Sequence, residues 1–147
     1  MNVRSILRRK GAYAETVSDE MTVRDAAQRM LEKRIGCLVV IDSAGSLLGI
    51  LRERDFAYAL TKHPRLAGYM SIGPLIISGI EKCKPEDSLT EVMSIMTRCR
   101  ARYLPVIEHD ALVGIVSIGD VLRHQLEALE PGLGTMRKDQ SSPSTFR

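Results

Sequence analysis

The chain has 147 residues, of which 44% are apolar and 27% charged, and its formal net charge is +3. This composition is typical of a soluble globular protein with one domain or two small units, and the length excludes a barrel enzyme. No apolar run reaches the roughly 18 residues of a membrane span, and no secretion signal is seen, so we expect a cytoplasmic protein without a membrane partner. The three cysteines lack metal-ligand or disulfide spacing, so we expect no metal.

The first residues of the chain are basic and predict a short helix over residues 3–9. They bring four cationic side chains close together, namely Arg4, Arg8, Arg9 and Lys10. We expect this cluster to form a solvated helix face. Nucleic-acid binding through it is the alternative, which the small net charge does not favour. Residues 1–12 are therefore predicted to be an N-terminal helix and lead-in.

The next segment, residues 13–62, predicts a unit in which strand, helix, strand, strand and helix follow one another. Thr22, followed three residues later by Asp25, has the spacing of a helix N-cap with an acidic partner. The apolar stripe behind it marks a helix with one buried face, at Val23, Ala26, Ala27, Met30 and Leu31. The later elements expected are strands over 37–41 and 47–51 and a helix over 55–61.

The same pattern returns after a connector over 63–78, in a second unit over 79–130. Gly49 and Gly114 lie 65 positions apart, and so do Asp55 and Asp120. The elements expected here are a helix after Ser88, strands over 103–107 and 111–116, and a helix over 120–129. The chain is therefore an internal repeat. The Ser/Pro/Gly-rich tail over 131–147 is predicted to be disordered.

The motifs GILRERD and GIVSIGD, with CLVVID and YLPVIE before them, point to a known family. The two units resemble a pair of cystathionine-beta-synthase (CBS) domains, the tandem arrangement called a Bateman module, and small stand-alone bacterial members in particular. The fold that this resemblance implies is α+β, with two β-α-β-β-α repeats stacked with pseudo-two-fold symmetry.

The resemblance implies a regulatory module rather than an enzyme. Family members commonly bind adenosine-containing ligands between their repeats, so we expect AMP ahead of ADP, ATP, NAD(H) or S-adenosylmethionine. They commonly pair as homodimers, and they regulate a partner protein that this sequence does not identify. A nucleic-acid-binding regulator and a ligand-free dimerisation scaffold are the alternatives.

The resemblance assigns a nucleotide site to the second repeat. Asp120 suits the ribose diol because a carboxylate accepts two hydrogen bonds, and Ser117 lies in the same loop. Cationic side chains suit the phosphates. The implied residues are Asp120 and Ser117 for ribose, Ile115, Tyr103, Ala101 and Cys83 around the base, and Arg100, Arg102 and Lys84 for phosphate.

A second, weaker site is implied in the first repeat. Its residues are Asp55, Ile35, Cys37, Ser18 and Arg34, with Arg52 at the position where the family usually has a ribose-binding Ser or Thr. This departure puts ligand binding there in doubt. In both repeats the aspartate has a purely structural alternative as a helix cap, and the arginines have one as solvated surface residues.

Overall fold

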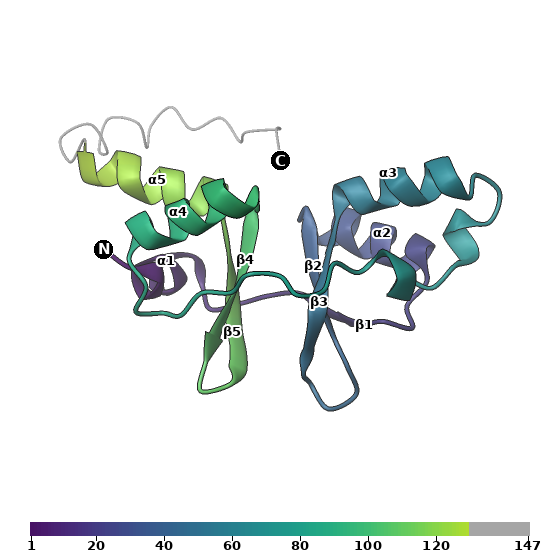
Figure 1. The fold of residues 1–147 in the computed structure, drawn as a ribbon, viewed down its shortest axis with the longest axis horizontal. Coiled ribbons are helices and arrows are strands. Elements are labelled where there is room, and N and C mark those ends of the chain that lie inside the picture. The colour runs from purple at the N-terminus through teal and green to yellow at the C-terminus, as the bar shows by residue number, and fades with distance from the viewer. Residues whose placement is uncertain (130–147) are drawn as a thin grey trace. The chain divides into compact units, whose positions relative to one another are not determined.

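The computed structural model describes residues 1–129, so the tail predicted to be disordered lies outside the described residues. The chain forms two compact units (Figure 1). One unit is Ala14–Ile80, and the other joins Met1–Tyr13 to the described residues from Glu81 onward. Helices and two small sheets confirm the α+β class. In the described range, no helix is both long and apolar enough for a membrane span.

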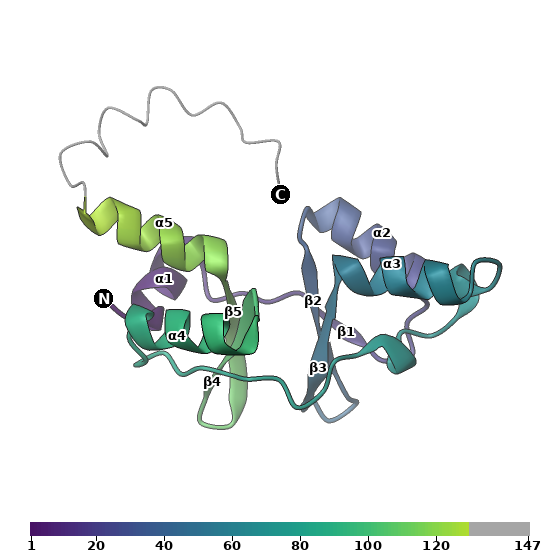
Figure 2. The ribbon, with the colours of Figure 1, turned by 45° about the horizontal axis from the view of Figure 1, so that its top comes forward.

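The unit Ala14–Ile80 contains a three-stranded sheet in the order β1-β2-β3. Strand β1 runs parallel to β2, and β2 is antiparallel to β3. Figure 2 shows α2 and α3 beside one another over this sheet. The elements are β1 (Thr16–Ser18), α2 (Val23–Lys33), β2 (Cys37–Ile41), β3 (Leu47–Arg52), α3 (Glu53–Lys62) and two short 3-10 turns, η1 (Ala67–Tyr69) and η2 (Gly73–Leu75).

Helix α2 forms as its sequence predicts. The Thr22 side chain accepts a 3.1 Å hydrogen bond from the Asp25 backbone N–H, which satisfies a donor in the first turn. The helix ends where Arg34 takes a left-handed conformation, with φ 58°. Val23, Ala26 and Met30 face the core. The expectation that Leu31 belongs to this buried stripe is wrong, since it is 79% exposed.

Gly49 is required because the connector between the repeats crosses directly over β3. Ile77 and Ile50 exchange two backbone hydrogen bonds, of 3.2 and 3.3 Å. A Cβ atom at Gly49 would lie 2.1 Å from the Ile77 carbonyl oxygen, which is far inside van der Waals contact. The glycine in this copy of the motif therefore makes room for the chain's own backbone.

The second unit is built around the antiparallel pair β4-β5. The elements are α1 (Val3–Lys10), α4 (Leu89–Cys99), β4 (Tyr103–Glu108), β5 (Ala111–Ser117) and α5 (Ile118–Leu129). A first strand was expected here too, but it is reduced to one parallel bridge between Cys83 and Val106. Helix α4 has a complete capping box, in which Ser88 and Glu91 each accept the other's backbone N–H.

Helix α1 completes the core of this second unit. Val3, Ile6 and Leu7 are buried in the same apolar cluster as residues of α4, β4, β5 and α5. The first turn of α1 donates backbone N–H groups to the carbonyls of Asp87 and Pro85, at 3.0 and 2.8 Å. These donors have no partner within the helix, so the contact fixes the helix start onto the loop before α4.

The burial of two cysteines gives a direct test of the packing. Cys37 and Cys83 are buried and Cys99 is exposed. Burial raises the pKa of the Cys37 thiol to about 12 and does the same for Cys83. The thiolate is the reactive form, so at about pH 8 we expect one fast-reacting thiol with Ellman's reagent in the native protein and all three after unfolding. Cys99→Ser should abolish the fast phase, and a fast phase that persists in this variant would contradict the packing.

Candidate functional site

Asp120 and Ser117 form one hydrogen-bonded unit at the junction of β5 and α5. Ser117 is the last residue of β5, and α5 begins at Ile118, two residues earlier than expected. The Asp120 carboxylate accepts the Ser117 backbone N–H at 2.9 Å, and the Ser117 hydroxyl accepts the Asp120 N–H at 3.1 Å. This pair of hydrogen bonds is a capping box, so Asp120 stabilises the start of α5 as well as being a candidate ligand-binding residue. The same contacts fix the carboxylate in one orientation.

Cations surround the Asp120 carboxylate. Lys10, the last residue of α1, places Nζ 2.8 Å from the Oδ2 atom of Asp120. Arg123 places Nη1 4.0 Å from Oδ1. Burial raises the pKa of Asp120, but the hydrogen bonds from Lys10 and from the Ser117 backbone outweigh it and lower the pKa overall. The side chain is 13% exposed. It is therefore a charged carboxylate that solvent and ligands reach only in part.

The equivalent aspartate of the first repeat, Asp55, is held by one neighbouring arginine. Its Oδ2 atom accepts the Arg52 backbone N–H at 2.7 Å and the Arg52 Nε–H at 3.3 Å. Its Oδ1 atom accepts from Arg52 Nη2 at 3.1 Å. A guanidinium that spans both oxygens is a geometrically specific, charge-assisted pair. Both acceptor atoms of this carboxylate are thus engaged within their own repeat.

Several predicted residues of the second repeat lie next to Asp120 and Ser117. Tyr103 pairs with Ser117 across the two strands. The Arg102 carbonyl accepts the Ile118 backbone N–H at 2.8 Å, so the chain just before β4 meets the start of α5. Ile115 lies two residues before Ser117 on β5 and pairs with Pro105. Partly buried Ala101 and exposed Arg100 precede Arg102 in the chain, and Arg100 ends α4 in a left-handed conformation.

Cys83 lies beside the middle of β4, where it forms backbone hydrogen bonds with Pro105 and Ile107, and Lys84 follows it in the chain. Cys83 bridges Val106, three residues along β4 from Tyr103, which corresponds to about 10 Å. Cys83 and Lys84 line a hollow of about 650 Å³ at the hairpin turn. The residues around this hollow are Lys82, Cys83, Lys84, Glu86, Asp87, Ile107, Glu108, His109 and Asp110. Within this unit the predicted base and phosphate residues therefore extend from the start of β4 to its middle and to the hollow at the hairpin.

The first repeat repeats this arrangement with different side chains. Cys37 pairs with Arg52 across β2 and β3, next to Asp55. Arg34 ends α2 in the same left-handed conformation that Arg100 has in α4, and Ile35 follows it with a backbone bond to Met30. Ser18 is further away, because it pairs with Ile41 at the opposite end of β2.

Lys10 is the site residue that sequence analysis missed. It lies 110 positions from Asp120, and in the sequence it belongs only to a basic cluster. The expectation that this cluster forms a solvated helix face agrees with the exposure of Arg8, Arg9 and Lys10. Arg4, Arg9 and Lys10 also form ion pairs with acidic side chains, which was not expected. Within residues 1–129, no group of three or more His, Cys, Asp or Glu is placed to hold a metal ion.

Comparisons of the sequence and of the structure with known proteins identify relatives from one family. The family model described as "CBS domain" matches residues 3–62 and 72–127. The CBS-domain containing protein ATU1752 from Agrobacterium tumefaciens has a TM-score of 0.80 at 32% identity, over 84% of this chain and 98% of that one. The CBS domain-containing protein YhcV of Bacillus subtilis (strain 168) is 31% identical over 111 residues, which cover 76% of this chain and 78% of YhcV.

A further solved structure contains a ligand. CBSX2, crystallised in complex with AMP, has a TM-score of 0.68 at 24% identity, over 79% of this chain and 90% of that one. At this identity the likeness is one of fold. Other curated relatives are longer than this chain, which spans 56% and 35% of the length of two of them.

Proposed function

Since the chain belongs to the family of CBS-domain proteins, we propose that it is a non-catalytic regulatory module that binds an adenosine-containing nucleotide at its second repeat. AMP is the ligand we propose first, ahead of ADP, ATP, NAD(H) and S-adenosylmethionine. The AMP complex of CBSX2, a protein of the same fold, supports this ligand class. The choice of repeat rests on the residues of this chain.

The arrangement of Asp120 and Ser117 is the observation that carries the proposal. A ribose cis-diol offers two O–H donors, and a charged carboxylate accepts two hydrogen bonds. The lowered pKa of Asp120 keeps its carboxylate charged near neutral pH. Ser117 accepts the Asp120 N–H through its hydroxyl oxygen, and a hydroxyl that accepts one bond still has its own proton to donate.

The first repeat does not offer the same chemistry. A diol would have to displace the Arg52 guanidinium from both oxygens of Asp55 before it could bind there. Charge-assisted pairs of this kind are among the stronger hydrogen bonds in proteins. We therefore propose one nucleotide per chain, bound at the second repeat.

The alternatives receive less support from the structure. The hypothesis of nucleic-acid binding was based on the basic N-terminal helix. Arg4, Arg9 and Lys10 of this helix form ion pairs with acidic residues of their own unit, which offset their charge. A homodimer and a cytoplasmic location remain part of our proposal. Helix α5 offers an apolar face for the homodimer, since Leu122, Leu126 and Leu129 are exposed, whereas Val121 of the same helix is buried in the core.

Titration calorimetry against AMP tests the proposed function, with ADP, ATP, NAD, NADH and S-adenosylmethionine as further ligands and GTP as the control for the base. We expect AMP to bind with one site per chain and GTP to give no heat. Binding to the folded state alone should also raise the melting temperature, by an amount equivalent to about 2.7 kcal/mol at a hundredfold excess over Kd. If no adenosine ligand binds in either assay, the chain is a ligand-free scaffold and the proposal fails.

A further inference from the structure

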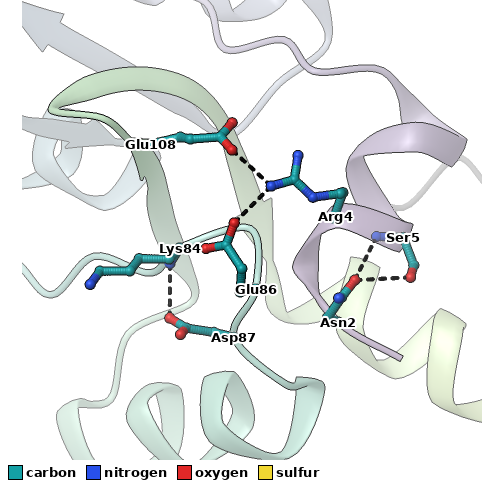
Figure 3. Close-up of polar contacts among 7 residues, drawn as sticks. All are labelled: Asn2, Arg4, Ser5, Lys84, Glu86, Asp87 and Glu108. Carbon is teal, nitrogen blue, oxygen red and sulfur yellow. Dashed lines mark hydrogen bonds and ion pairs between the residues drawn. The ribbon is translucent and has the colours of Figure 1, made fainter.

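Ion pairs and backbone contacts attach helix α1 to the rest of its unit, at both the start and the end of the helix. At its start, the Arg4 Nη2 atom lies 2.7 Å from Glu86 and 2.7 Å from Glu108, so one guanidinium joins the loop before α4 to the hairpin (Figure 3). One residue before its end, Arg9 pairs with Glu127 of α5. Lys10, at the end, pairs with Asp120. This last contact differs from the others, because it uses the carboxylate of the proposed nucleotide site.

The Lys10 contact fills an acceptor that a ribose would need. Oδ2 of Asp120 already accepts the Ser117 backbone N–H at 2.9 Å, and the Lys10 ammonium donates to the same oxygen at 2.8 Å. A carboxylate oxygen has about two lone-pair sites. A ribose diol that engages both carboxylate oxygens must therefore replace one of these donors on Oδ2.

Of the two donors, Lys10 is the one that can leave. The Ser117 N–H belongs to the backbone at the start of α5 and is fixed by the capping box. The Lys10 side chain is 31% exposed, and its flexible stem lets the ammonium return to water. Arg4 and Arg9 keep their own partners when it does so, which means that α1 stays docked while its last residue is released.

We propose that Lys10 is a latch on the nucleotide site: in the free protein it occupies Asp120, and ligand binding displaces it. This inference rests on the proposed function. Lys10 is followed by Gly11, which ends the helix with φ 99°, and residues 11–13 then lead to the other unit at Ala14. A ligand that displaces Lys10 thus acts on the segment of chain that joins the two units.

The test compares Lys10→Met with Arg9→Met, because the two variants remove one cation each from adjacent positions of α1 and keep an apolar stem. We expect Lys10→Met to bind AMP about two- to fivefold more tightly than the wild type, the range that a partly exposed ion pair allows. Arg9→Met should leave the Kd unchanged. The gain should vanish with 2′,3′-dideoxyadenosine monophosphate, which has no diol to compete for Asp120.

The sign of the effect decides between the roles that Lys10 could have. A cation that simply attracts the phosphate would make Lys10→Met bind AMP more weakly, and an unchanged Kd would mean that Lys10 and the ligand do not compete. Either result overturns the latch while leaving AMP binding by the wild type, and with it the proposed function, intact. If neither the wild type nor Lys10→Met binds AMP, the proposed function itself fails. Thermal unfolding of both variants checks that α1 remains folded.

Discussion

Replacing Asp120 with alanine is expected to weaken AMP binding by about 10- to 100-fold, since hydrogen bonds to a charged group contribute about 1.5–3 kcal/mol. Asp55→Ala is expected to change the Kd less than about twofold, because both oxygens of Asp55 are held by Arg52. Titration calorimetry of the two variants against AMP measures both effects.

The two variants are matched controls for each other. Each aspartate accepts a backbone N–H at the start of a helix, from Ser117 in one case and Arg52 in the other. Each substitution should therefore cost a similar amount of stability, about 1 kcal/mol. A difference in AMP affinity then reports on the ligand rather than on the fold. Equal losses of affinity, or a larger loss from Asp55→Ala, would show that the nucleotide does not depend on Asp120 as proposed.

Gly49→Ala is expected to lower the free energy of unfolding by about 3 kcal/mol, which corresponds to roughly 10 °C in Tm. The new methyl group would lie 2.1 Å from the Ile77 carbonyl oxygen and 2.6 Å from the Ile76 side chain. Because one of these atoms belongs to the backbone, the connector must move and the two hydrogen bonds between Ile50 and Ile77 are lost.

Gly114→Ala should cost less than about 1 kcal/mol, although the glycine occupies the same place in the motif. A methyl group there meets Leu7 Cδ2 at 2.9 Å, and Leu7 can turn the end of its side chain away. Thermal unfolding of both variants makes the comparison. Losses of the same size would mean that both glycines serve strand geometry in general rather than the close approach of different segments.

The sequence predicted the repeat and most of the elements because these depend on local signals. Thr22 and Ser88 were predicted as N-caps, and this is confirmed, since α2 and α4 begin at the next residues, Val23 and Leu89. The strand over 37–41 was also predicted with the bounds that β2 has. In contrast, the first strand of the second repeat could not be judged from its residues, because a single bridge at Cys83 is set by tertiary pairing.

The candidate site was predictable only in part for a similar reason. Asp120 and Ser117 are three residues apart, so the motif contains both. The contact between Lys10 and Asp120 depends on α1 packing into the core of the second unit, through buried residues such as Ile6 and Leu7. No local pattern encodes a pair separated by 110 positions. The pairing of Asp55 with Arg52 could be predicted only in part. The sequence shows the unusual arginine, but not that its guanidinium binds both oxygens of the Asp55 carboxylate.

The docking of α1 also affects how the protein is made. One compact unit is continuous over Ala14–Ile80, whereas the other is assembled from the segments on either side of it. During synthesis the chain emerges from its N-terminus, so the continuous unit can fold first. Val3, Ile6 and Leu7 must meanwhile wait for α4, β4 and β5 before their surfaces are covered. Helix α1 is thus made before the segments that cover it, and its apolar face stays exposed on the nascent chain until those segments have followed.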